Sequence, residues 1–138
     1  KLESNIDVWD LVTLEDYVFV GPSVVFTNDL IPRAKYPKKN FPSYGKWHPT
    51  LVKNGASIGA NATVLCDTIV GKSAIVGAGS LVSKEIPDYA IVVGNPAKII
   101  GWACECGNKL VFKNDKADCG MCARSYKKNG DQIAPLFQ

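Results

Sequence analysis

Aliphatic residues recur at every sixth position through most of this chain, in two separate blocks. Steps of six from Leu2 meet only apolar residues as far as Phe26, and steps of six from Val52 do so as far as Val82, eleven positions in all. This period excludes an amphipathic α-helix, because six residues advance a helix by about 600° and the apolar stripe would change direction. In extended chain, six residues return a side chain to the same face, so the pattern indicates strands.

Small residues and glycines share the same period, which limits the length of each strand. In the second block, a mostly small residue follows each aliphatic position by four, and glycine often follows it directly. Turn residues at this spacing predict short strands with a bend after each one, and three bends close a triangular coil. Stacked coils would bury the aliphatic positions in one continuous core, so we expect an all-β parallel β-helix rather than a sandwich.

Two hexapeptides, Ile58-Gly-Ala-Asn-Ala-Thr and Val76-Gly-Ala-Gly-Ser-Leu, resemble those of the hexapeptide-repeat acyltransferases. The segment 87–101 is also similar to the one that ends the helix in this family. The resemblance implies a left-handed parallel β-helix over residues 1–102, although general rules for parallel crossovers favour right-handed connections. Eleven hexapeptides make fewer than four coils, and we expect further coils upstream.

Residues 28–50 interrupt the repeat and are expected to project from one edge of the helix. This segment combines tryptophan, tyrosine and proline with five basic residues, which are Arg33, Lys35, Lys38, Lys39 and Lys46. Cations suit phosphates and aromatic rings suit sugars or bases, so a sugar nucleotide is a fitting ligand. A solvated surface insertion is the alternative.

The motifs Phe26-Thr-Asn-Asp, with Pro-Arg soon after, and Trp47-His-Pro-Thr resemble one subfamily in particular. Its members N-acetylate a 3-amino sugar on UDP or dTDP in surface polysaccharide synthesis, including that of lipopolysaccharide. The resemblance implies that Asn28 is catalytic and that Asp29, Arg33 and Trp47 bind the substrate. It also implies a homotrimer in which the loop of one subunit reaches the next. Turn formation is the alternative role for Asn28 and Asp29.

The same resemblance implies that acetyl-CoA is the cosubstrate. Ala60 and Ala78 are expected to let it approach the backbone, and Lys98 to meet its phosphates. His48 is the only histidine, but it occupies the variable position of its motif and is expected to face solvent. A departing thiolate can take the proton of the amine, so we predict that no histidine base is needed.

Four cysteines form a separate group in the last part of the chain, residues 103–138. Cys104 and Cys106 have CxC spacing, and Cys119 and Cys122 have CxxC spacing. Four thiolates suit tetrahedral zinc, so a small zinc-ribbon-like module with a structural zinc ion is expected. Two disulfides or free thiols remain the alternatives, and Cys66 is left over as an inert thiol.

Composition narrows the remaining possibilities. The net charge is only +3, and the sequence lacks the strong basic stripe that is typical of a nucleic-acid binder. No apolar run is long enough to span a membrane. No secretory signal opens the sequence, which favours a reducing compartment, so a cytoplasmic protein is expected. In a reducing compartment a tight cysteine group more often holds metal than disulfides. The rival hypotheses are a non-catalytic β-helix scaffold with a zinc-ribbon interaction module, and an O-acetyltransferase acting on a sugar or serine.

Overall fold

The structure is a computed structural model that describes residues 1–35, 40 and 46–136. Lys38 and Lys39 of the predicted loop lie outside the described residues. The described part of the chain holds strands, turns and no α-helix, which confirms the all-β prediction. No helix of the described chain is long and apolar enough to cross a membrane.

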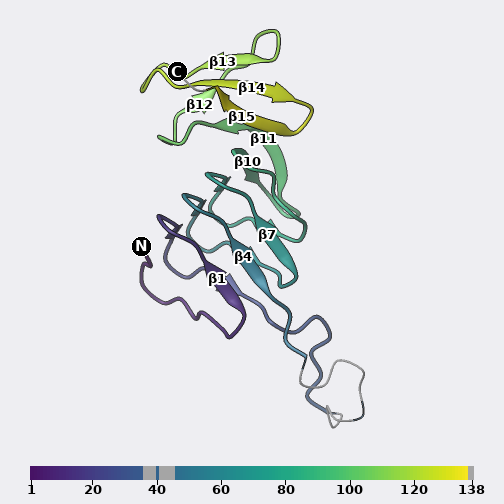
Figure 1. Cartoon of the computed structure of the whole chain (residues 1–138). Coiled ribbons are helices and arrows are strands. Elements are labelled where there is room, and N and C mark those ends of the chain that lie inside the picture. Colours follow the sequence, from purple (N-terminus) through teal and green to yellow (C-terminus); the bar gives the residue numbers. More distant parts are fainter. Residues whose placement is uncertain (36–39, 41–45, 137–138) are drawn as a thin grey trace.

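Short parallel strands stack into the three faces of a left-handed β-helix, as predicted (Figure 1). The first face consists of β1 (Val12–Leu14), β4 (Thr50–Val52) and β7 (Thr68–Val70). The second face contains β2 (Phe19–Val20), β5 (Ser57–Ile58) and β8 (Ile75–Val76), and the third contains β3 (Val25–Phe26), β6 (Thr63–Val64) and β9 (Leu81–Val82).

The pairing register shows how the hexapeptides become coils. Ile58 pairs with Val76, so one coil takes 18 residues, or three hexapeptides. Val20 pairs with Ile58, which is 38 residues on, so the segment between β3 and β4 adds 20 residues to its coil. In Figure 1 the described ends of this segment, residues 27–35 and 46–49, project from one edge of the helix.

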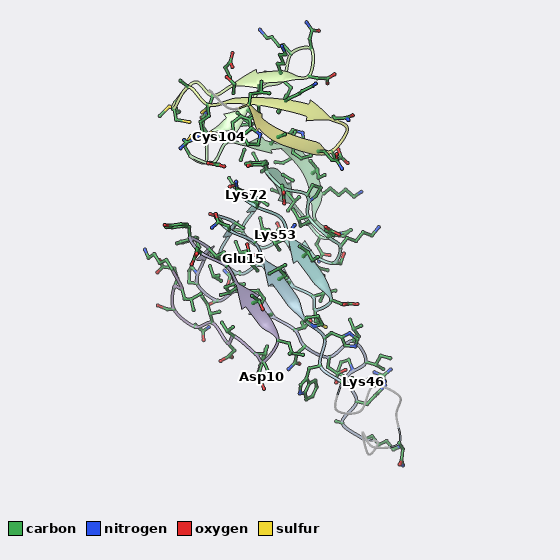
Figure 2. The ribbon with its side chains drawn as sticks, in the orientation of Figure 1. Asp10, Glu15, Lys46, Lys53, Lys72 and Cys104 are labelled. Atoms are coloured by element: carbon green, nitrogen blue, oxygen red, sulfur yellow. The ribbon has the colours of Figure 1, made fainter. Side chains whose placement is uncertain are left out.

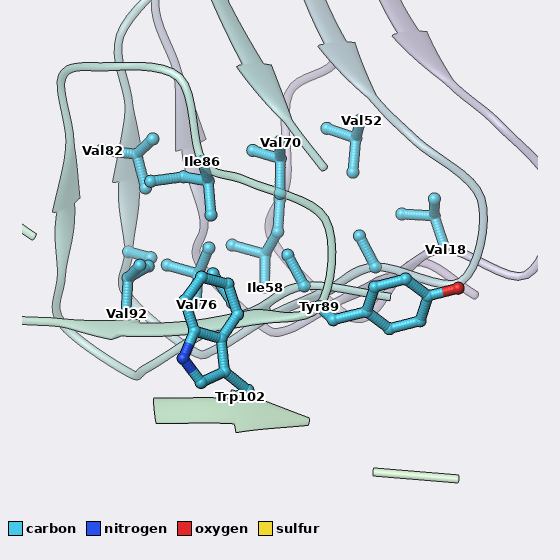
Figure 3. Close-up of a cluster of buried hydrophobic side chains, with 14 of the residues drawn as sticks. Val18, Val52, Ile58, Val70, Val76, Val82, Ile86, Tyr89, Val92 and Trp102 are labelled. Carbon is cyan, nitrogen blue, oxygen red and sulfur yellow. The ribbon is translucent and has the colours of Figure 1, made fainter. Parts of the chain in front are cut away.

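The aliphatic positions form the interior of the helix (Figure 3). All six positions of the second block are essentially inaccessible, as are Val20 and Phe26 of the first. The small residues that follow them are buried at the bends, where Ala56, Ala62 and Ala74 have no exposed surface. Leu2 and Val8 are 53% and 42% exposed instead, because no described coil packs beneath them.

Antiparallel pairing replaces the coils at the end opposite the N-terminus (Figure 1). β10 (Ala90–Val93) continues the second face parallel to β8, and β11 (Lys98–Ala103) and β12 (Lys109–Leu110) then add antiparallel strands. Trp102 of β11 is 6% exposed and covers the aliphatic interior (Figure 3).

The last three described strands form a separate antiparallel sheet. It contains β13 (Lys116–Asp118), β14 (Ser125–Asn129) and β15 (Gln132–Leu136), in that order. Tyr126 of β14 is fully buried and belongs to the same apolar cluster as Trp102. The division of the chain into a β-helix of residues 1–102 and a C-terminal module of residues 103–138 stays a prediction.

Candidate functional site

The corner after β3 carries Asn28, and two hydrogen bonds join this corner to the coil above it. The Thr27 N–H donates to the Val64 carbonyl at 3.1 Å, and the Cys66 N–H donates to the Thr27 hydroxyl at 2.9 Å. Asn28 follows this fixed residue directly and is half-buried. Asn28 therefore lies where the loop leaves this hydrogen-bonded corner.

The two ends of the loop meet at this corner. The His48 N–H donates to the Asn28 carbonyl at 3.0 Å, which closes the base of the loop. His48 is half-buried, so it is less open to solvent than expected. The sequence separates these residues by twenty positions, but the fold brings them together.

The other predicted substrate-binding residues begin and end the loop. The Asp29 carboxylate accepts a hydrogen bond from the Ile31 N–H at 2.9 Å, the geometry of a local turn. Arg33 is exposed, and its guanidinium donates to the Pro32 carbonyl at 2.8 Å. Trp47 is 39% exposed beside His48.

The predicted acetyl-CoA residues lie at a different corner. Ala60 and Ala78 occupy equivalent bends, after β5 and β8, and the Gly79 N–H donates to the Ala60 carbonyl at 2.8 Å. The bends stack so closely that a Cβ on Gly59 would lie 2.5 Å from the Ala78 nitrogen. Ala60 is half-buried, while Ala78 and Lys98 are exposed.

This second corner does not coincide with the Asn28 corner within one chain. Asn28 follows β3, whereas Ala60 precedes β6, and β3 and β6 are paired in parallel. The two corners therefore lie at opposite ends of the strands of the third face. One chain does not bring the predicted catalytic and cofactor residues together at one edge.

The four cysteines of the C-terminal part do come together. Their sulfur atoms all lie within 4.8 Å of one another. Cys104 and Cys122 are 3.4 Å apart at sulfur, and Cys106 and Cys119 are 3.5 Å apart. Zinc–sulfur bonds of about 2.3 Å in a tetrahedron place sulfurs roughly 3.8 Å apart, so the group fits one zinc ion.

Two tight turns present these sulfurs. Cys104 and Cys106 lie between β11 and β12, where the Cys104 N–H donates to the Asn108 carbonyl at 2.8 Å. Cys119 and Cys122 lie between β13 and β14, where the Cys119 N–H donates to the Arg124 carbonyl at 2.8 Å. Each pair thus belongs to a hairpin, and the two hairpins face each other across the sulfurs.

Backbone donors favour the thiolate form on one side of the group. The Met121 N–H points at the Cys119 sulfur at 3.5 Å and is the main reason that the pKa of Cys119 is lowered to about 6. The backbone N–H of Arg124 likewise lowers the pKa of Cys122. Burial raises the pKa of Cys104 to about 12. A bound metal cation would offset the free-energy cost of a buried Cys104 thiolate, because metal coordination deprotonates a thiol.

Glu105, between the first two cysteines, links this group to the β-helix. Its carboxylate forms ion pairs with Lys72 at 3.0 Å and Arg124 at 3.7 Å, and it accepts a hydrogen bond from the Tyr89 hydroxyl at 3.2 Å. Its N–H donates to the Tyr126 hydroxyl, which also lies 3.1 Å from the Cys104 sulfur. Figure 2 shows Lys72 and Cys104 on the same side of the molecule.

Replacing Glu105 with glutamine is expected to destabilise the protein by about 1 kcal/mol at neutral pH, the scale of partly exposed ion pairs. The Lys72 hydrogen bond is the main cause that lowers the pKa of Glu105. A carboxyl group whose pKa is lower in the folded than in the unfolded state stabilises the fold at pH values above its unfolded-state pKa. This stabilisation is lost as the pH falls through the folded-state pKa. The stability difference between the parent and Glu105→Gln should therefore shrink as the pH falls below about 4.

Urea unfolding of both proteins at pH 7 and at about pH 3, below the ordinary glutamate pKa, measures this difference. Asp131→Asn, on the turn between β14 and β15, removes the same charge away from Lys72 and is the matched control. An equal effect of both substitutions at pH 7 would argue against the link.

The comparisons with known proteins concern the β-helix. No family model matches the chain. A dTDP-3-amino-3,6-dideoxy-alpha-D-galactopyranose 3-N-acetyltransferase from Aneurinibacillus thermoaerophilus is 50% identical over 95 residues, which cover 69% of this chain and 47% of that protein. Serine acetyltransferase 4 from Arabidopsis thaliana is 41% identical over 71 residues, 51% of this chain and 20% of that one. The chain thus spans about half the length, or less, of these curated relatives.

Solved structures share the fold. Galactoside acetyltransferase in complex with coenzyme A matches with a TM-score of 0.58 at 25% identity, covering 72% of this chain and 48% of that one. AntD, an N-acyltransferase from Bacillus cereus in complex with dTDP-4-amino-4,6-dideoxyglucose and coenzyme A, matches with a TM-score of 0.59 at 17% identity, covering 73% and 57%. The resemblance to hexapeptide-repeat acyltransferases is confirmed.

Two residues of these sites escaped the sequence analysis. Glu105 lies between two cysteines, and only the fold shows that it reaches Lys72. Trp9 lies at the Asn28 corner, and its indole donates to the Phe26 carbonyl at 2.9 Å. The signal for Trp9 was present, because it precedes Thr27 by 18 residues, the length of one coil.

Proposed function

We propose that this chain carries the acceptor site of an acetyl-CoA-dependent N-acetyltransferase that acts on a nucleotide-linked amino sugar in surface polysaccharide synthesis. The observation that carries the proposal is the half-buried Asn28 on the fixed corner where the loop begins and ends. Its support is the 50% identity to a relative that is named as an N-acetyltransferase of a dTDP-linked 3-amino sugar. Acetylation of that sugar nucleotide by the purified protein, followed by mass spectrometry, is the direct test.

The reaction is an acyl transfer in which the amine nitrogen attacks the thioester carbonyl. A C–N bond forms, the C–S bond breaks, and the departing thiolate takes the proton of the amine. The Asn28 side-chain amide orients the amine or donates to the carbonyl oxygen as negative charge develops there. Asp29, Arg33 and Trp47 bind the sugar nucleotide from the base of the loop, and catalysis is mainly positioning.

A histidine base is the second candidate mechanism, and it belongs to an O-acetyltransferase. The observation that favours it is that His48 is half-buried at the Asn28 corner instead of facing solvent. A hydroxyl is a poor nucleophile without a general base, whereas an amine is not, so the two mechanisms differ in their need for His48.

Acetyl-CoA is proposed to lie along the bends of Ala60 and Ala78, with Lys98 near its phosphates. These bends offer small side chains and exposed backbone, which suit the amide chain of pantetheine. Because the two predicted sites occupy different corners of one chain, we infer that the reaction site forms between the Asn28 corner of one subunit and the bends of its neighbour. A homotrimer supplies this arrangement three times.

The trimer is tested by light scattering coupled to size-exclusion chromatography at micromolar concentration. A mass near three times the 14.9 kDa of the chain is expected. Mixing an Asn28→Ala chain with a Lys98→Ala chain should then restore activity, because mixed trimers contain intact composite sites. A stable monomer that retains full turnover would contradict the composite site.

The four thiolates are proposed to hold one structural zinc ion. The sulfur spacing and the backbone donors to Cys119 and Cys122 fit a four-thiolate site. All four positions of a tetrahedron are then filled by protein, which leaves no open position for a substrate. The zinc ion would hold the two hairpins together, with residues 103–138 as a separate module of a cytoplasmic enzyme.

A further inference from the structure

Trp9 occupies the same corner as Asn28, one coil nearer the N-terminus. Asp7 bridges Val25 in parallel, and counting two residues on from this pair places Trp9 beneath Thr27. Adjacent strands are about 4.8 Å apart, so the Trp9 backbone lies about one coil spacing from Thr27, the residue before Asn28. On the other side of the corner, Val12 pairs with Thr50, so the strand that follows the loop lies one coil above β1.

A hydrogen bond fixes the Trp9 ring against this corner. The indole N–H donates to the Phe26 carbonyl at 2.9 Å, and the Trp9 carbonyl accepts from the Val12 N–H at 3.2 Å. Because the N–H reaches the coil above, the ring is directed toward the loop-bearing corner and away from the open end below Leu2.

The anchored ring nevertheless keeps much of its surface open. Trp9 is 47% exposed, although its polar group is already satisfied by Phe26. The indole N–H is already paired, so the surface of the ring left open is apolar. An anchored indole with an open apolar surface suits the C–H face of a sugar ring. Asp10, the next residue along the chain, lies at the lower edge of the coil in Figure 2.

We propose that Trp9 is a substrate-contact residue whose indole packs against the sugar ring while Asn28 meets its amine. This inference rests on the proposed function and adds a specificity element to it from outside the loop. It places the sugar across two coils, with Trp9 beneath it and the Asn28 corner beside it. Sequence resemblance to the loop motifs does not include Trp9, because it lies in the preceding coil.

The test compares Trp9→Leu and Trp9→Phe with the parent in steady-state kinetics, using dTDP-3-amino-3,6-dideoxygalactose and acetyl-CoA. We expect Trp9→Leu to raise KM for the sugar nucleotide about tenfold, the scale of a lost aromatic contact, and to leave KM for acetyl-CoA within about twofold. Trp9→Phe should have a KM for the sugar nucleotide between those of the parent and Trp9→Leu. Tyr17→Leu is the matched control, because Tyr17 is an aromatic of the next turn that is 88% exposed at another corner.

A binding measurement separates this inference from the proposed function. Titration of the parent with the same sugar nucleotide should quench tryptophan emission, and titration of Trp9→Phe should give at most half of that quenching. Equal quenching in both proteins, or equal changes of both KM values in Trp9→Leu and Tyr17→Leu, would overturn the inference. A parent protein that binds but forms no acetylated product would count against the proposed function alone.

Discussion

Asn28→Ala is expected to lower turnover by about 10²–10³, while coenzyme A binding is kept. An amide that donates to a developing oxyanion, or that orients the attacking amine, acts mainly in the transition state, and its loss has this scale in other acyl transfers. The bends that would bind coenzyme A lie at another corner, so their geometry should not change. Initial rates with saturating substrates, and calorimetry with coenzyme A, measure the two effects separately.

His48→Ala is the matched control for Asn28→Ala, because both residues lie at the base of the loop and are joined through their backbones. The side chain of His48 does not take part in that hydrogen bond, so the corner should be preserved. Turnover within a few-fold of the parent is expected if the thiolate takes the proton. The opposite pattern, with His48 essential and Asn28 dispensable, would favour a histidine-base O-acetyltransferase.

Removal of zinc is expected to unfold the C-terminal hairpins while the β-helix keeps its structure. The free energy of zinc binding is also folding free energy in small four-ligand modules, where it reaches about 10–16 kcal/mol. β13, β14 and β15 form a sheet of their own, which meets the rest of the described chain through the apolar packing of Ala117, Tyr126 and Ile133. Hydrogen exchange before and after chelation should show lost protection in β13, β14 and β15, and retained protection in β4 to β9.

Metal analysis of protein purified without chelator should find about one zinc ion per chain. Cys119→Ser should lower this content strongly, whereas Cys66→Ala, which changes the cysteine outside the cluster, should leave it unchanged. A metal-free parent with unchanged hydrogen exchange would contradict the zinc site. A chain mass reduced by the hydrogens lost on oxidation would identify disulfides instead.

The β-helix was largely predictable because its information is local and repeated. A period of six on extended chain assigns each aliphatic residue to the interior, and Val20, Ile58 and Val76 are buried as predicted. The break in the repeat located the loop in the same way. Leu30, four residues after Phe26, is 49% exposed, because the chain has already left the coil there. Handedness came from the family resemblance, since a period of six fits coils of either hand.

Contacts between distant segments required the tertiary structure. The cysteine spacing indicated a metal site, but only the facing hairpins show that all four sulfurs meet. No local pattern could show that Glu105 reaches Lys72, 33 residues earlier, because this pairing depends on how the last hairpins pack against the β-helix. Likewise, Trp9 meets the Asn28 corner only because stacked coils bring residues 18 positions apart into contact. The sequence by itself determined the coil and its interior, whereas packing between coils and hairpins decided which side chains share a site.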